Sequence, residues 1–264
     1  MMQPCGSRTS MVSLALIALS ASLQNGMMIE AFAPSPAFAV STTALSAEAT
    51  SSTAVSFIDT ELRGAAMKLH TREQAPKEGE APAKKMEPYV PTRADYLQFL
   101  VDSQHVYQAL EDIVNRNDEL AVFRSCGLER TAPLEKDIEF MASEYGLSRP
   151  PVGKFGKDYA TSLRAMESTP ELVCHFYNFY FAHTAGGRMI GKKMSAMLLE
   201  KKTLAFYEWD GDLNEIKSRV KGDIEAMAAS WSDEERKECV DATAATFVGG
   251  GSINSYLSGG QNPH

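Results

Sequence analysis

The segment CHFYNFYFAHTAGGRMIGKK, residues 174–193, combines a run of aromatic residues with three closely spaced glycines. Gly186, four further residues, Gly191 and a lysine nearly reproduce the G-x-x-x-x-G-K-[ST] loop that binds nucleotide phosphates. Such a loop follows a β-strand and ends in a Ser or Thr that holds magnesium. Here Thr169 begins a predicted helix, and Lys193 stands at the Ser/Thr position. The context therefore excludes a nucleotide-binding loop.

The residues before the glycines predict a helix that runs into them. Thr169 is a candidate N-cap, Pro170 suits the first helical position, and Glu171 is an acid in the first turn. Each glycine inside a helix costs about 1 kcal/mol relative to alanine, so something must offset the loss. Three explanations stay open: close packing against another helix, an end and restart of the helix, or a kink at Gly186 and Gly187 that brings backbone near a flat ligand.

Apolar residues recur at helical spacing over most of the chain from Phe57 onward. No stretch shows the sustained alternation of apolar and polar residues that is typical of strands. The sequence therefore predicts an all-α fold with about eight or nine helices. The apolar positions that define the buried stripes are Ile58, Leu62 and Leu69; Leu97, Leu100, Tyr107, Leu110 and Val114; and Ile216, Val220, Ile224 and Met227.

Capping residues predict where several helices begin and end. Thr92 and Thr131 are candidate N-caps, and Gly146 is a candidate C-terminal stop. Ser232, with a glutamate three residues later, has the spacing of a capping box for the last helix. We expect that helix to break at residues 249–251, which are three consecutive glycines.

The N-terminus reads as a targeting segment. Residues 11–23 form an apolar run that is too short for a membrane helix of about twenty residues but suits a secretory signal. A Ser/Thr/Ala-rich stretch follows, and together they resemble the two-part presequence of plastids of secondary origin; a plain secretory signal with a disordered spacer is the alternative. The predicted divisions are a signal peptide over 1–31, a plastid transit-like segment over 32–56, a helical domain over 57–258 with an exposed, proline-containing linker at 76–91, and a tail over 259–264.

Charge and cysteine content narrow the function classes. The formal net charge of −8 disfavours nucleic-acid binding, which needs a basic surface. Cys5 would leave with the signal, and Cys126, Cys174 and Cys239 are far apart with no C-x-x-C spacing. Such a scattered set indicates reduced thiols and argues against both a disulfide framework and a zinc site.

A flat ligand that carries a metal would need an axial donor, so the five histidines matter. His183 precedes the glycine pair by about one turn, and His175 is expected to be a hydrogen-bonded core residue. From the residues alone, His70 and His105 read as surface positions, and His264 is the last residue. A di-iron carboxylate bundle is disfavoured because none of the five has a glutamate three residues before it.

Four segments resemble the plastid, plant-type heme oxygenases in the same order and at similar spacing. They are MKLHTREQA at 67–75, LQFLVDSQHVYQALE at 97–111, the segment at 174–193, and LAFYEWDGDL at 204–213. The resemblance covers roughly residues 57–248. It implies a single-domain, all-α heme oxygenase-like fold in which heme lies between a proximal helix and a kinked, glycine-rich distal helix.

The resemblance also assigns roles to residues. His70 takes the position of the axial ligand of the heme iron, and Gly186 and Gly187 lie in the distal helix that approaches the iron. His183 falls where animal and bacterial relatives carry an Asp, and it is expected to hold the distal water that delivers protons. The glycine-rich C-terminus differs from the family's usual helical end. The residues expected to bind heme are Arg63, Tyr177, Gly191, Lys217 and Lys221.

The implied reaction is the O2-dependent opening of heme at one meso carbon to biliverdin, carbon monoxide and ferrous iron. Heme is then both substrate and cofactor. Reduced ferredoxin is the implied electron donor and partner, a downstream bilin reductase is a further one, and the mature chain is expected to be a monomer without a membrane span. The alternative is a helical heme-binding protein without turnover. The basic residues expected to dock the acidic ferredoxin are Lys68, Arg72, Arg188, Lys192 and Lys193.

Overall fold

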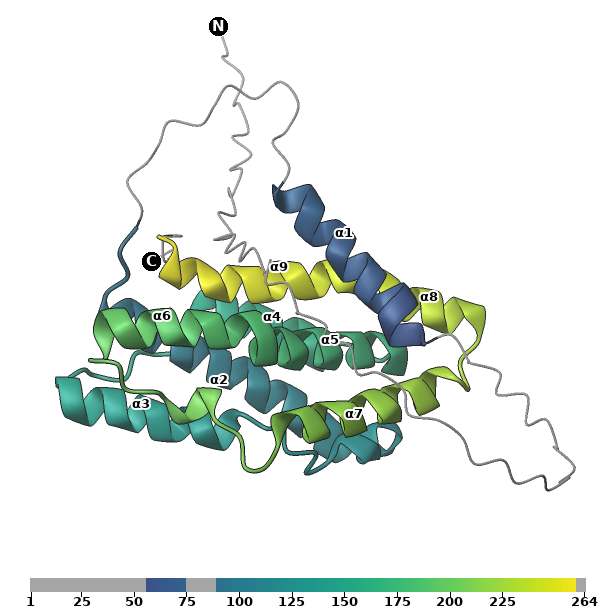
Figure 1. Ribbon diagram of the computed structural model, residues 1–264, viewed down its shortest axis with the longest axis horizontal. Coiled ribbons are helices and arrows are strands. Elements are labelled where there is room, and N and C mark those ends of the chain that lie inside the picture. Colours follow the sequence, from purple (N-terminus) through teal and green to yellow (C-terminus); the bar gives the residue numbers. More distant parts are fainter. Residues whose placement is uncertain (1–55, 75–88, 260–264) are drawn as a thin grey trace, which may run out of the picture. The chain divides into compact units, whose positions relative to one another are not determined.

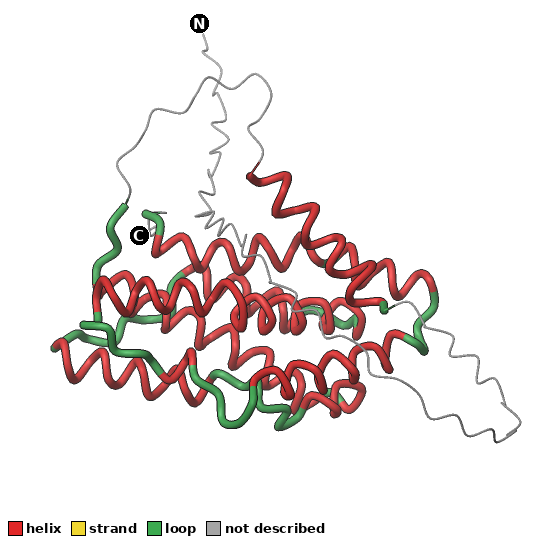
Figure 2. The backbone as a smooth tube through the Cα atoms, in the orientation of Figure 1, coloured by secondary structure: helices red, strands yellow, loops and turns green. Residues whose placement is uncertain are grey.

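The computed structural model describes residues 56–74 and 89–259, which belong to one compact unit. Side chains from His70 to Gln74 lie outside this description, although their backbone is part of a helix. The predicted signal peptide, nearly all of the transit-like segment and of the linker, and the tail beyond 259 also lie outside it. In the described ranges every regular element is helical, as Figure 2 shows, so the all-α prediction is confirmed.

Nine α-helices and five short 3-10 or π segments follow one another in the described ranges (Figure 1). No helix among these is long and apolar enough to cross a membrane. The elements are η1 Ile58–Leu62, α1 Arg63–Gln74, α2 Arg93–Arg116, η2 Asp118–Phe123, α3 Thr131–Tyr145, α4 Lys154–Arg164, α5 Thr169–Ala182, η3 His183–Gly187, α6 Arg188–Leu198, η4 Ala205–Tyr207, α7 Leu213–Ala228, α8 Asp233–Asp241, α9 Thr243–Asn254 and η5 Ser255–Leu257.

Helix α2 contributes more buried residues than any other helix of the described ranges. It packs against α3 and α4, while α5 packs against α8 and α9. Tyr107 joins the two groups, because its ring lies 4.7 Å from that of Phe179 and 5.0 Å from that of Tyr180 on α5. Helix α1 continues from η1 and packs against α9 (Figure 1).

Most of the predicted apolar positions form the core, whereas Leu69 on α1 is half-buried. All five stripe positions of α2 are buried, and so are Ile58 and Leu62 before α1. On α7 the first three positions are buried and Met227 is half-buried against the core. Helical periodicity therefore identified the faces that pack inward.

The helix starts confirm two predicted caps and correct two. Thr92 and Ser232 each form a capping box. Helix α5 begins one residue earlier than expected, because its N-cap is Ser168, whose hydroxyl accepts a hydrogen bond from Glu171 N, and not Thr169. The predicted Thr131 cap is wrong: the N-cap of α3 is the residue before it, and a side chain from another helix satisfies the free N–H groups.

Four helical starts take this cap from a carboxylate on a distant helix. Glu111 of α2 accepts two backbone N–H groups at the start of α3, at 2.7 and 3.0 Å. Asp102 of α2 accepts two backbone N–H groups at the start of α4, at 2.7 and 2.9 Å. Glu225 of α7 accepts two at the start of η1, both at 2.9 Å. Asp137 of α3 caps η4. We call these four residues the cross-capping carboxylates.

The helix capped by Ser232, α8, ends at Asp241, and a second helix, α9, runs through residues 249–251, so the predicted break there is wrong. The C-terminal segment is helical up to Asn254 and continues as the 3-10 turn η5. Close packing explains why glycine is tolerated. A Cβ atom on Gly249 would lie 2.6 Å from the ring of Tyr159 on α4. Beyond the helix, the hydroxyl of Tyr256 donates to Asp102 at 2.9 Å and fastens the end of the chain to α2.

Candidate functional site

A π-helical turn, η3, joins α5 to α6 at the glycine pair. The backbone stays in the right-handed helical region on both sides of the turn, at Ala182 and at Arg188. The glycines therefore neither end the helix nor leave it regular. Single π turns within helices are frequent at functional sites. The π turn lies where the sequence predicted a kink in the distal helix, and the kink itself stays a prediction.

The three glycines of this region differ in what surrounds them. A Cβ atom on Gly186 would meet nothing within 4 Å. One on Gly187 would lie 2.7 Å from Nδ1 of His183, and one on Gly191 would lie 2.6 Å from the ring of Tyr207. Gly191 thus serves close helix packing, and its expected heme contact stays a prediction. Gly186 is the glycine that leaves open space beside the backbone.

His183 is buried in a cluster of aromatic rings. Its ring stacks on that of Phe206, with centroids 3.9 Å apart, and the rings of Tyr207 and Trp209 lie 5.3 and 5.4 Å away. Its Nε2 atom lies 2.8 Å from the carbonyl oxygen of Phe206. Because a carbonyl only accepts, Nε2 carries the proton in the neutral ring. Nδ1 is then left as an acceptor beside Gly187.

The environment of His183 keeps this ring neutral. Burial lowers the pKa of His183 to about 3, and the charges of Arg130 and Arg188 act in the same direction, although the bond to the Phe206 carbonyl raises it. At neutral pH this side chain cannot act as an imidazolium acid. It can order a water molecule by accepting a hydrogen bond at Nδ1.

Three of the expected heme-binding residues lie around one acid, Asp59. Its carboxylate is 3.8 Å from Arg63 and 3.7 Å from Lys221. The ring of Tyr177 stacks on Phe181 at 4.6 Å, and burial raises the pKa of Tyr177, with a smaller contribution from the Asp59 charge. The sequence analysis did not identify Asp59. Its position four residues before Arg63 in a predicted helix could have indicated an ion pair between the two side chains.

The structure describes the side chain of Lys217 but not that of His70. Lys217 is half-buried on α7, one turn before Lys221. His70 lies in α1, but its side chain is outside the described part of the chain. Its assignment as the axial ligand therefore stays a prediction.

The other histidines have structural surroundings. His175 is 1% exposed, and its Nδ1 atom lies 2.8 Å from the hydroxyl of Tyr159 and 3.3 Å from that of Thr246. The predicted hydrogen-bonded core histidine is confirmed, and burial lowers its pKa to about 4. His105, expected on a solvated face, is half-buried, and burial lowers its pKa.

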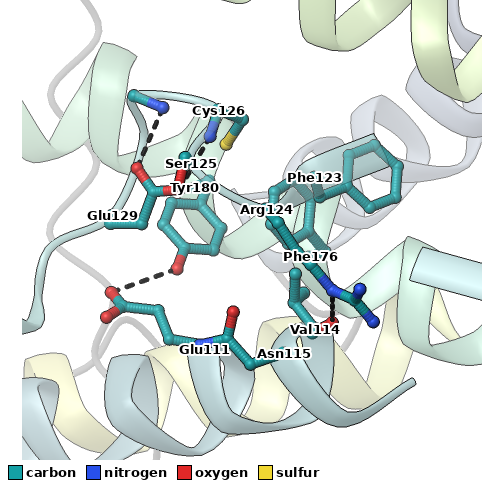
Figure 3. A pocket seen from close by; sticks show the side chains of 11 residues that line it. Glu111, Val114, Asn115, Phe123, Arg124, Ser125, Cys126, Glu129, Phe176 and Tyr180 are labelled. Atoms are coloured by element: carbon teal, nitrogen blue, oxygen red, sulfur yellow. Dashed lines mark hydrogen bonds between the residues drawn. The ribbon is translucent and has the colours of Figure 1, made fainter. Parts of the chain in front are cut away.

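Two hollows lie near this region. Figure 3 shows one of about 300 Å³ on the core side of α5, lined by Phe176 and Tyr180. The hydroxyl of Tyr180 donates to Glu111 at 3.5 Å there, and the Glu129 carboxylate already accepts two backbone N–H groups. A second hollow, of about 600 Å³, is lined by Tyr207 and by other residues around the His183 cluster. None of the expected heme-binding residues lines either hollow, so we assign neither a role in heme binding.

Known proteins are similar to this chain over most of its length. The sequence profile of the heme oxygenase family matches residues 58–249. The chloroplastic heme oxygenase 1 of Oryza sativa subsp. japonica is 43% identical over 206 residues, which are 75% of this chain and 70% of the relative. The chloroplastic heme oxygenase 1 of Arabidopsis thaliana is 41% identical over 202 residues, 73% of this chain and 71% of the relative.

One further relative bears on activity, and one solved structure bears on the fold. A probable inactive heme oxygenase 2 of Arabidopsis thaliana is 36% identical over 167 residues, 62% of this chain and 56% of the relative. The crystal structure of heme oxygenase-1 from Synechocystis sp. PCC6803 in complex with heme has a TM-score of 0.60 at 19% identity, covering 78% of this chain and 93% of that one. At that identity the likeness concerns the fold alone.

Proposed function

The chain belongs to the heme oxygenase family, and from that premise we propose how its own residues serve the oxidative cleavage of heme. The observation that carries the proposal is the π turn η3. It combines open space at Gly186 with an unprotonated ring nitrogen beside Gly187. Heme supplies the iron, where O2 is activated, and the porphyrin ring that is opened.

On the distal side, Gly186 has no side chain, so the space beside its backbone is free for the porphyrin. Nδ1 of His183 accepts a hydrogen bond from a water molecule and so holds a proton donor near the reacting edge. The ring of His183 keeps its orientation because Phe206 binds it both by stacking and by the carbonyl group. The expected effect is an ordered water at a fixed place rather than a proton carried by the histidine.

On the proximal side, the imidazole of His70 would hold the iron. Helix α1 also carries an exposed apolar side chain, Met67, and Met189 on α6 and Val248 on α9 are exposed as well. Apolar surface of this kind suits a porphyrin face. Replacing His70 with Ala should abolish the absorption spectrum of histidine-ligated heme, and an unaltered spectrum would place the ligand elsewhere.

The basic residues near Asp59 would bind the heme propionates. Arg63 and Lys221 pair with Asp59 at distances near 4 Å, and these side chains are all more than a third exposed. Such pairs contribute at most about 1 kcal/mol, so a propionate carboxylate can replace Asp59 as their partner. Lys217 would add a further cation from α7.

We propose reduced ferredoxin as the electron donor and an acidic protein as the partner class. Arg188, Lys192 and Lys193 are exposed on α6, and Lys68 is exposed on α1. A local basic surface can steer an acidic partner despite the net charge of −8. Reduction by ferredoxin should then slow as salt rises, and a salt-independent rate would contradict this docking surface.

The two relatives named heme oxygenase 1 are chloroplastic. We propose a plastid location for this chain too, reached through the signal-like and transit-like segments in a secondary-plastid alga. Biliverdin formed there would feed bilin synthesis by a bilin reductase.

The decisive experiment is aerobic incubation of the purified mature chain with hemin and a reductant. An enzyme converts the heme Soret band into the absorption of green biliverdin, identified by chromatography against authentic isomers. A heme-binding protein without turnover keeps the Soret band. The probable inactive relative makes this second candidate worth separating.

A further inference from the structure

The turn η4 is fastened by a residue from another helix. Its N-cap, Leu204, offers no side-chain acceptor. Instead, the carboxylate of Asp137 on α3 accepts the N–H groups of Ala205 and Phe206, one at each oxygen, at 2.8 and 2.7 Å. Asp137 is 4% exposed. Both free N–H groups at the start of the turn are therefore satisfied by one buried side chain.

The same turn holds His183. The carbonyl of Phe206 accepts the Nε2 proton of His183 at 2.8 Å, and the Phe206 ring stacks on the imidazole. A carboxylate that binds two consecutive N–H groups fixes the peptide planes between them. The Phe206 carbonyl belongs to the next peptide plane, whose N–H, that of Tyr207, donates to the carbonyl oxygen of Leu204 at 3.1 Å within the turn. Asp137 therefore acts on this carbonyl through the backbone of η4.

Neighbouring contacts hold the other end of the turn. The guanidinium of Arg130 donates to the carbonyl oxygens of Phe206 and Glu208, and the hydroxyl of Tyr96 donates to that of Tyr207 at 3.0 Å. These contacts restrict where η4 can lie. The Asp137 carboxylate accepts the N–H of the residue whose carbonyl binds His183.

We propose that Asp137 is a positioning residue for the distal site, which fixes the orientation and the Nε2-protonated tautomer of His183 through η4. The inference rests on the proposed function for the role of the His183 Nδ1 atom. The carbonyl of Phe206 selects the tautomer because only a protonated nitrogen can bind to it. If η4 loosens, the imidazole can rotate or exchange its proton between the two nitrogens, and the acceptor is no longer aimed beside Gly187.

The first test is Asp137→Asn, measured in the protein without heme. The amide keeps one acceptor but replaces the other by a donor, so one backbone N–H loses its partner. Nitrogen-15 NMR of the imidazole ring reports which nitrogen carries the proton. We expect one Nε2-protonated form of His183 in the wild type and a mixture of both tautomers in the variant. Biliverdin formation should fall about tenfold with hemin affinity unchanged.

Two variants serve as controls. Asp137→Glu keeps both acceptor oxygens and should recover a larger share of the wild-type tautomer than Asp137→Asn does. Ser232→Ala removes the capping box of α8 and costs about 1 kcal/mol of stability, but it should leave the His183 signals unchanged. A change in Ser232→Ala equal to that in Asp137→Asn would reduce the effect to general destabilisation and overturn the inference.

The outcomes separate the inference from the proposed function. A single Nε2-protonated His183 in Asp137→Asn overturns the positioning role. A tautomer mixture with undiminished biliverdin formation supports the positioning role and contradicts the proposed role of His183.

If Asp137→Asn does not fold, the wild type gives the same test. Burial raises the pKa of Asp137 to about 6, with Glu208 raising it and Lys202 lowering it by their charges, while Tyr96 and Tyr207 also lie near. The second tautomer should appear as the pH falls through this value. One unchanged tautomer at a pH where carbon-13 NMR shows the Asp137 carboxyl protonated would overturn the inference.

Discussion

Gly186, Gly187 and Gly191 share a sequence motif but differ in what a side chain would meet. At Gly186 an added methyl group faces open space, whereas at Gly191 it would overlap the ring of Tyr207. At Gly187 it would press on Nδ1 of His183. Loss of heme binding and loss of stability should therefore come from different glycines.

Replacing Gly186 with Ala should leave folding intact and impair the site. The free energy of unfolding without heme should stay equal or rise by up to about 1 kcal/mol, because alanine is the better helix former. Hemin affinity or biliverdin formation should fall at least about tenfold, because the methyl group occupies the space assigned to the porphyrin. Chemical denaturation and hemin titration measure the two effects.

Gly191→Ala is the matched control. Its methyl group would overlap Tyr207, so the free energy of unfolding should fall by about 1–3 kcal/mol. Wild-type hemin binding and turnover by Gly186→Ala would show that the porphyrin does not lie against that residue.

At the scale of the elements, the spacing of apolar residues predicted the helices and their buried faces because both depend on local sequence. It did not predict the start of α3, since the cap comes from Glu111 on α2. Likewise, the position of His183 next to the glycines was readable, but its partner Phe206 was not. Contacts between distant segments are the part of the site that a single sequence does not show.

Asp59 lies in η1 and pairs with Arg63 of α1 and Lys221 of α7. In the proposed site it would compete with the heme propionates for these two cations. Asp59→Asn should therefore tighten hemin binding about twofold to fivefold at low salt, in keeping with the small contribution of exposed ion pairs. Equilibrium titration at two ionic strengths measures the effect.

The control for Asp59 is Glu61→Gln. Glu61 lies on the same segment but pairs with Arg236, at 3.1 Å, and not with Arg63 or Lys221. The Glu61→Gln variant should therefore bind hemin with the wild-type affinity. Weaker hemin binding by Asp59→Asn would mean that Asp59 supports the site rather than competes with the ligand.

Asp102 is the most connected of the cross-capping carboxylates. It is fully buried and accepts hydrogen bonds from two backbone N–H groups of α4, from Gln98 and from Tyr256. Asp102→Ala should lower the free energy of unfolding by about 3 kcal/mol or more, because it leaves several buried donors without partners.

Asp95→Ala removes a capping acid from a half-buried position at the start of α2 and should cost only about 1 kcal/mol. Urea denaturation of both variants compares a cap from a distant helix with a local one. Equal losses would contradict the importance given to the distant contacts.

For the whole molecule, burial of neutral histidines makes stability depend on pH. The pKa of His175 is about 4 in the folded chain, against about 6.5 for a free histidine. Between these values the unfolded chain binds a proton that the folded chain does not. Stability therefore falls as the pH falls through this window.

Replacing His175 with Gln removes this contribution. Between about pH 5.5 and 4.5 the wild type should lose about 1.2 kcal/mol more than the variant. Urea denaturation at several pH values measures the difference in slope. Parallel curves for the two proteins would show that His175 titrates normally in the folded state.

The cross-capping carboxylates also bear on the order in which a newly made chain can assemble. The first helical segment, which leads into the helix bearing His70, is tied down at its start by Glu225 of α7. That glutamate is synthesised long after the segment it secures. In the proposed site α1 forms the proximal side of the heme pocket. The start of this helical segment can be secured only after most of the polypeptide has been synthesised, so we expect a chain truncated before α7 not to bind heme.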